Sequence, residues 1–318
     1  MKKILFRSLI SLFFIALLFW AVREDIPKII HVLQNINRRL LLVAVTIFLF
    51  TVFVLARRLQ IIFGAEGIPL KFFDSSNLTF IGYFFNNFLP TSVGGDIVKA
   101  MCASRVTNEP VKSVTSVLMD RIFGLFTFIM IPSVSLLFFL KEIRDPKVPI
   151  LVYSFLAFSI LFFFLLFNRN MARRFRFIET LLNYVKLGSK VRKVYEGLHK
   201  FKDQKMLIAN AMLLSIVGQS VNIFVLYILA VAMGVQVNIV YFFLLVPVVH
   251  LISMVPSLNG LGVREWAYIK FLSPYIGREY AAAIGILWLS LLLLLSVIGG
   301  LIYLFRHDYH IRFKEATA

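Results

Sequence analysis

The chain has 318 residues, of which 60% are hydrophobic and 16% are charged. A soluble domain carries about a quarter charged residues and about half apolar ones, so this composition excludes a soluble globular protein. The formal net charge of +18 would suit a nucleic-acid binder, but the basic residues lie between hydrophobic stretches. In that position they indicate cytoplasmic loops facing anionic lipid headgroups. We therefore expect an all-α polytopic membrane protein with no nucleic-acid partner.

About six apolar stretches are long enough to cross a bilayer core of roughly 30 Å as helices. The first follows a basic start and lacks a small-residue cleavage pattern, so we interpret it as an uncleaved span. The predicted full spans cover residues 4–22, 40–56, 113–140, 149–167, 206–233 and 280–304. Between the first two, residues 26–37 predict a short helix at the membrane surface.

Two further segments, residues 72–107 and 238–275, are apolar but interrupted. The interruptions read LPTSVGGDIVK and VPSLNGLGVRE. Backbone that leaves the helical form at membrane depth survives only inside protein or beside a watery cavity. We expect each segment to form a re-entrant helical hairpin with a polar break; ordinary surface loops between two short spans are the alternative.

The helices that follow these breaks predict an anion site, because helix N-termini carry free N–H donors and partial positive charge. Small and polar residues precede each helix and are expected to form a phosphate-compatible nest. They are Thr91, Ser92, Gly94 and Gly95 in the first segment, and Ser257, Asn259, Gly260 and Gly262 in the second.

The basic residues also predict orientation. Residues 168–205 carry 11 Lys/Arg against three acidic residues, which places this loop in the cytoplasm. Both termini and a loop expected at Arg57 and Arg58 then fall on the same side. With this topology a repeat at about 40–140 and one at about 206–304 have inverted orientations, as in many transporters. Residues 1–318 are thus expected to form a single integral membrane domain.

The basic segment 168–205 also places apolar residues at helical spacing. Two amphipathic helices lying on the inner membrane surface fit this pattern. A packed cytoplasmic helix pair fits it equally well.

Charged residues inside apolar runs are the main candidate ligands. Asp120 and Arg121 interrupt a long apolar stretch, where a charge at the bilayer centre costs at least ~2.5–3.5 kcal/mol. Arg121 offers a guanidinium fork that holds phosphate at two points, while Asp120 suits a structural salt bridge equally well. Lys99 and Arg264 compete with Arg121 for the phosphate. Weaker candidates, which more often join helices, are Asn86, Asn87, Gln219, Asn222, His250 and Asn259.

The sequence contains no Walker loop, no metal-ligand spacing and no nucleophile elbow. We therefore expect no catalytic site, no metal and no cofactor. The single cysteine, Cys102, is expected to serve as a small apolar residue.

Together the motifs resemble one family. They are an Asn-Pro-Gly-Asp element, an acidic–Arg pair and a late Pro-x-x-x-Gly-x-Gly-x-Arg-Glu element. This set resembles the flippase-like transmembrane domain of lysylphosphatidylglycerol synthases, including its small stand-alone members. Lys99 stands where the family often has arginine. The resemblance implies substrate-binding roles for Asn87, Pro90, Gly95, Asp96, Lys99, Asp120, Arg121, Pro256, Asn259, Gly260, Gly262, Arg264 and Glu265.

In the full-length synthases a soluble aminoacyl-transfer domain follows this membrane domain, whereas this sequence stops at Ala318. The resemblance therefore implies the transport half of the activity. The leading hypothesis is a flippase- or scramblase-like translocase of the cytoplasmic inner membrane. It would move an anionic, aminoacylated or polyprenyl-phosphate-linked lipid between leaflets, passively or coupled to an ion gradient.

Two alternatives remain open. The first is a membrane enzyme or enzyme-partner subunit in the synthesis of a modified phospholipid or a lipid-linked sugar, with Glu265 or Asp96 as general base. The second is an anchor that docks a soluble synthase or glycosyltransferase through residues 168–205.

Overall fold

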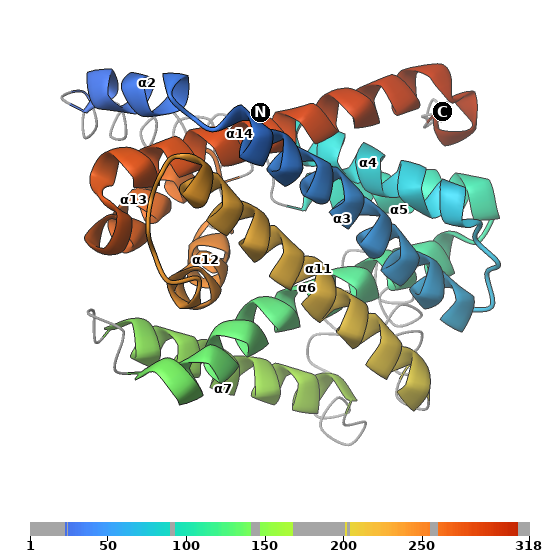
Figure 1. The fold of residues 1–318 in the computed structure, drawn as a ribbon. Coiled ribbons are helices and arrows are strands. Elements are labelled where there is room, and N and C mark those ends of the chain that lie inside the picture. The colour runs from blue at the N-terminus through green and yellow to red at the C-terminus, as the bar shows by residue number, and fades with distance from the viewer. Residues whose placement is uncertain are drawn as a thin grey trace, which may run out of the picture.

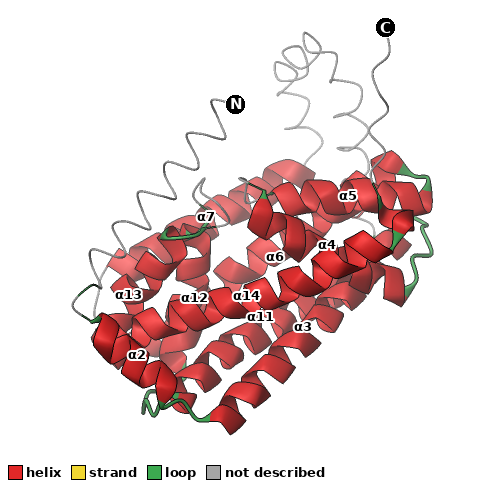
Figure 2. Cartoon of the chain, turned by 90° about the horizontal axis from the view of Figure 1, so that it is seen from above, coloured by secondary structure: helices red, strands yellow, loops and turns green. Residues whose placement is uncertain are grey.

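The computed structural model describes residues 23, 25–89, 93–140, 147–167, 201, 204–254 and 260–310. Figure 2 shows the described elements as helices joined by short loops. The α-helices are α2 (Ile26–Gln34), α3 (Arg38–Ala65), α4 (Phe72–Phe88), α5 (Gly94–Thr107), α6 (Pro110–Phe139), α7 (Lys147–Phe167), α11 (Lys205–Ala232), α12 (Val240–Ile252), α13 (Val263–Ile276) and α14 (Arg278–Phe305). A short 3-10 helix, η3 (His307–Tyr309), follows α14.

Four of the described helices, α3, α6, α11 and α14, are long and apolar enough to cross a membrane. Each has 28 to 30 residues, which at 1.5 Å per residue gives roughly 42 to 45 Å, more than the bilayer core requires. They match four of the predicted spans. Helix α7 matches the fifth, and the first, residues 4–22, lies outside the described residues. The all-α class and the polytopic character are confirmed.

Both interrupted segments form a helix, a break and a second helix. Helices α4 and α5 pack on each other across the first break, and α12 and α13 pack across the second. Helix α2 also forms where the sequence predicts a short helix. Most of the basic segment 168–205 lies outside the described residues.

Helices α3 and α11 lie side by side and run antiparallel (Figure 1). At one end the Gln204 amide, just before α11, donates to the Ala65 carbonyl at 3.0 Å. At the other end the Asn37 N–H, just before α3, donates to the Ala232 carbonyl at 2.8 Å. Since each broken segment follows one of these helices, the α4–α5 and α12–α13 hairpins begin at opposite ends of the pair.

The remaining packing has a matching pattern. Helix α4 packs on α14, and α12 packs on α6. If α3 is exchanged with α11, α4 with α12 and α6 with α14, the same helix pairs result. Two copies of one helical unit would give this pattern of contacts. The division into repeats at about 40–140 and 206–304, and their opposite orientation in a membrane, stay predictions.

Helix α3 corrects one expectation. We expected a loop at Arg57 and Arg58, but α3 continues to Ala65 and carries both arginines within it. The residues that follow, Leu59, Ile62 and Phe63, are buried at helical spacing, so the helix keeps a core face after the charges. Arg58 itself is buried, whereas Arg57 is exposed.

Glycines allow α4 and α14 to approach closely. A Cβ at Gly299 would overlap the Phe80 carbonyl oxygen, and one at Gly300 would meet the Phe84 ring at 2.9 Å. In a bilayer, where lipid is as apolar as the helix surface, such close backbone contact is a main source of helix association.

We predict that Gly299→Ala lowers the free energy of unfolding of the purified protein by about 1–3 kcal/mol, because the added Cβ overpacks the contact with α4. Its melting temperature should fall accordingly. The matched control is Gly64→Ala, because a Cβ there meets nothing within 4 Å. Alanine at this helical position should leave the melting temperature unchanged or raise it slightly. The melting temperatures are measured in detergent, and equal values for the two variants would contradict the packing described for Gly299.

Candidate polar cavity inside the helical bundle

A polar cavity of about 180 Å³ lies between α3, α4, α5, α6 and α11. A second cavity, also about 180 Å³, reaches toward α12, α13 and α14. The two adjoin, since they share Tyr83, Asn86, Arg121, Phe128, Gln219 and Asn222 as lining residues. We call the two together the central cavity. Its volume admits several water molecules or one small polar group.

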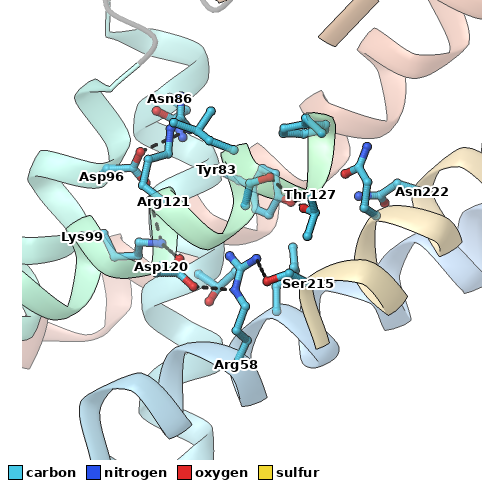
Figure 3. A pocket seen from close by; sticks show the side chains of 17 residues that line it. Arg58, Tyr83, Asn86, Asp96, Lys99, Asp120, Arg121, Thr127, Ser215 and Asn222 are labelled. Atoms are coloured by element: carbon cyan, nitrogen blue, oxygen red, sulfur yellow. Dashed lines mark hydrogen bonds and ion pairs between the residues drawn. The ribbon is translucent and has the colours of Figure 1, made fainter. Parts of the chain in front are cut away.

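Asp120 holds the first part of the central cavity together (Figure 3). Its Oδ1 accepts from Arg58 Nε at 2.7 Å, and its Oδ2 accepts from Lys99 Nζ at 3.1 Å. Arg58 also donates to the Ser215 hydroxyl at 3.0 Å. All three charged side chains are less than one-tenth exposed. This network joins α3, α5, α6 and α11, so Asp120 has the structural role that its position allowed.

A second ion pair lies nearer the surface. Arg121 Nη1 is 3.3 Å from Asp96 Oδ2, and Lys99 Nζ is 3.7 Å from Asp96 Oδ1. The Arg121 side chain is 29% exposed, against 7% for Asp120. Because exposed ion pairs contribute little stability and buried ones are costly to break, Arg121 is the arginine that can exchange its partner more readily.

The first break is shaped by Gly95. Its N–H donates to the Asn86 side-chain oxygen at 2.9 Å. A Cβ at this position would overlap the Gly82 carbonyl oxygen and the Asn86 side chain. Glycine is therefore required for α5 to begin so close to α4, and α5 then brings Asp96 and Lys99 to the wall of the cavity.

At the second break the start of α13 is held by a side chain of the same helix, Glu265. Glu265 Oε2 accepts from the Gly262 N–H at 2.7 Å, while its Oε1 accepts from Arg264 Nη2, also at 2.7 Å. Gly260 and Gly262 adopt positive φ angles of 74° and 81°, which favour glycine. A Cβ at Gly260 would lie 2.8 Å from the Ser253 carbonyl. This turn aims Arg264 into the central cavity, with Glu265 behind it.

These contacts change the expected anion site. The N–H groups of Gly95 and Gly262, which we expected to donate to phosphate, already donate to Asn86 and Glu265. At these two positions the protein's own side chains occupy the helix N-terminus. Neither of these two N–H groups is therefore available to an anion.

Aromatic and imidazole groups line the far part of the central cavity. His250 Nε2 is 3.0 Å from the Tyr268 hydroxyl. The His250 ring stacks on Trp288 with centroids 5.6 Å apart and meets the edge of Phe128 at 5.4 Å. Three aromatic side chains thus contact the His250 ring.

Two amide side chains on α11 that line the cavity each have one buried atom without a hydrogen-bond partner among the described residues. They are Gln219, through Nε2, and Asn222, through Oδ1. Gln219 is 6% exposed, and a buried polar atom left unpaired costs about 1–3 kcal/mol. Their spacing of three places both on one face of α11. A donor and an acceptor are thus available to a polar molecule inside the cavity.

The structure separates the predicted site residues into groups. Asp96, Lys99, Asp120, Arg121 and Arg264 line the central cavity. Gly95, Gly260, Gly262 and Glu265 shape the two breaks. Pro90, Pro256 and Asn259, with Thr91, Ser92 and Ser257 of the predicted nests, lie outside the described residues, whereas Gly94 is the buried first residue of α5.

Asn87 is placed differently from the expectation. It donates to the Leu292 carbonyl at 3.1 Å and forms a hydrogen bond with the Ser296 hydroxyl, both on α14. Since Asn87 points to α14, it joins helices and is not one of the described residues that line the cavity.

Sequence reasoning missed Arg58, Tyr83 and Ser215 as cavity residues. Arg58 was assigned to a loop, yet it is followed by apolar residues at helical spacing. Asp120 in an apolar span also needed a basic partner, and an arginine inside another apolar run was the available signal. Tyr83 and Ser215 carry no comparable signal.

Fold and cavity together define a multi-pass helical membrane protein built around a charged polar hollow. The chain belongs to the family of the lysylphosphatidylglycerol synthase transmembrane region, whose family model matches residues 4–300. The resemblance seen in the motifs is thereby confirmed, and the family indicates a membrane protein of lipid modification or translocation. Comparisons with curated proteins and with solved structures give no match.

We predict that Arg58→Gln lowers the free energy of unfolding by about 3–5 kcal/mol, because it leaves Asp120 buried with one partner lost. The matched control is Arg57→Gln, since Arg57 is exposed and contacts only its helical neighbour Gln60 among the described hydrogen bonds. Its effect should stay within about 0.5 kcal/mol. Chemical denaturation in detergent measures both, and similar losses for the two variants would contradict the assigned role of Arg58.

Proposed function

We propose that this protein translocates a lipid with a phosphate-bearing headgroup between the leaflets of the cytoplasmic membrane. The observation that carries the proposal is the central cavity, which is polar and charged inside an apolar bundle and is reached by both broken hairpins. Arg121 and Arg264 come from different halves of the chain and line the same hollow. A headgroup in the cavity would avoid hydrocarbon while its chains stay in lipid.

The charge of the central cavity favours an anion. Among the described residues that line it, the basic ones are Arg58, Lys99, Arg121 and Arg264, and the acidic ones are Asp96 and Asp120. The surplus is two positive charges, which Glu265 behind Arg264 lowers to one. In a medium of low dielectric constant such a surplus attracts an anionic group more strongly than it would in water.

Two amide side chains in the central cavity can form hydrogen bonds to a lipid headgroup. Gln219 and Asn222 present a donor and an acceptor that the described protein does not use. A headgroup carries both hydroxyl and phosphoryl oxygens, so it can satisfy both. Together with the arginines they support recognition of a hydrogen-bonding anion over a bare ion.

Orientation and partners belong to the proposal as well. The basic segment 168–205 and the termini are proposed to face the cytoplasm, by the positive-inside rule. The same segment is the proposed docking region for a soluble synthase or glycosyltransferase.

We predict that Arg121→Gln and Arg264→Gln each slow lipid translocation by about ten- to hundredfold, the value of one charge-assisted hydrogen bond. The assay uses phosphatidylcholine vesicles with a trace of fluorescent phosphatidylglycerol, and dithionite reports the label that reaches the outer leaflet. Lys112→Gln is the control, because it removes one exposed positive charge from the same helix as Arg121. The proposal fails if the unaltered protein does not accelerate flip-flop of any lipid in a broad panel.

We further predict opposite effects of Gln219→Met on stability and transport. Methionine keeps the shape of the side chain but removes the unpaired amide, so unfolding stability should stay equal or rise. Translocation in the same vesicle assay should fall several-fold. Leu213→Met on the exposed face of α11 is the control and should change neither property. A variant that loses stability together with transport would assign Gln219 a structural role instead.

A further inference from the structure

An apolar groove of about 340 Å³ lies on the surface between α5 and α6. Its walls carry exposed apolar side chains: Val93 at the N-cap of α5, Ile97 and Met101 from α5, and Val114 and Leu118 from α6. On α5 these residues follow each other at a spacing of four, so they form one continuous stripe. Their exposed fractions reach 57% at Ile97, which is typical of a surface facing lipid.

The groove extends along the hairpin of α5 and α6. One end lies at Ser104 and Pro110, near the tight turn between the helices, and the other end lies at Val93. Eleven helical steps separate Val93 from Ser104, which gives a length of roughly 16 Å. An extended hydrocarbon chain matches both this shape and this surface.

Asp96 and Arg121 connect the groove to the central cavity. They line the groove at the end away from the turn, and both also line the polar cavity. Of the described residues that line the groove, these two are the charged ones. The ion pair that they form, 3.3 Å between Nη1 and Oδ2, therefore lies where the apolar surface meets the polar interior.

We propose that this groove holds one hydrocarbon chain of a phosphate-bearing lipid, with the phosphate replacing Asp96 as the partner of Arg121. The proposal rests on the proposed function, because it specifies where the cargo enters. Lys99, 3.7 Å from Asp96, remains to balance the displaced carboxylate. Opening the Arg121–Asp96 pair then admits the headgroup from the side, between α5 and α6, into the central cavity.

The two parts of the lipid contribute differently. A chain in the groove exchanges lipid contacts for equally apolar protein contacts, so it gains little affinity there. The groove instead sets the position of the chain, and the phosphate–Arg121 contact supplies the binding energy. A lipid without phosphate is therefore expected to visit the groove no more often than other lipid-facing surfaces.

The experiment uses the full chain in phosphatidylcholine vesicles and a phosphatidylglycerol probe with a photoreactive diazirine in one acyl chain. The comparison probe is diacylglycerol with the same chain. After illumination, mass spectrometry maps the labelled residues. We expect phosphatidylglycerol to label residues 93–118 about tenfold or more above diacylglycerol, as one charge-assisted hydrogen bond predicts, and Arg121→Gln to remove this preference.

Leu118→Trp fills the groove and should reduce its labelling several-fold. The control is Leu137→Trp, because Leu137 lies on the same helix, is 71% exposed and does not line the groove. Labelling that is spread evenly over the lipid-facing surface, or is unchanged by Leu118→Trp, overturns the groove even if the protein translocates lipid. Selective groove labelling by a protein that moves no lipid in the flip-flop assay supports the groove and refutes the proposed translocation.

Discussion

The structure depends on one buried carboxylate held between two cations. Asp120 accepts from Arg58 and Lys99 inside a bundle whose described surface is largely apolar. An isolated charge at this depth would be strongly unfavourable, so both cations must stay close. Because Asp120 lies on α6, its partners come from α3 and α5, and Ser215 of α11 completes the network, these contacts hold four helices around one hollow. The cavity is thus preformed by the charges that line it.

The two breaks present the same physical problem and have different solutions. A helix that begins inside a packed bundle leaves N–H groups that water cannot reach and that need acceptors from the protein. At Gly95 the acceptor comes from the preceding helix, through Asn86, whereas at Gly262 it comes from the same helix, through Glu265. Glu265 also pairs with Arg264, so the second solution couples the end of a helix to a cavity arginine.

The positions of the long helices and of the two interrupted hairpins are predictable from the sequence, because they follow from its hydropathy and from the Pro/Gly interruptions. The spans at 113–140, 206–233 and 280–304 lie within two or three residues of α6, α11 and α14. Both interrupted segments divide into helix pairs at the Pro/Gly stretches, since proline and glycine disfavour helix interiors. Arg121 and Arg264 also line the cavity as predicted from intramembrane charge.

The misplaced residues share one cause, which is that partners distant in sequence are not visible in a local pattern. Arg58 was assigned to the end of a span because a charge normally marks a membrane boundary; its burial depends on Asp120, 62 positions away. Asn87 was assigned to the substrate by its motif, but its partners lie on α14, more than 200 positions away. A single sequence records the residue that needs a partner and not the partner itself.

The unequal burial of the two ion pairs assigns them different roles. Breaking the Arg58–Asp120 pair would leave charges enclosed by protein, at a cost that would loosen four helices. Arg121 and Asp96 lie closer to the surface. Asp96 still has Lys99 nearby when Arg121 changes its partner. In the proposed exchange a guest anion adds one negative charge at Arg121, which the positive surplus of the central cavity offsets. On the proposed function, the Arg58–Asp120 pair maintains the hollow and the Arg121–Asp96 pair is the one that opens to admit the headgroup.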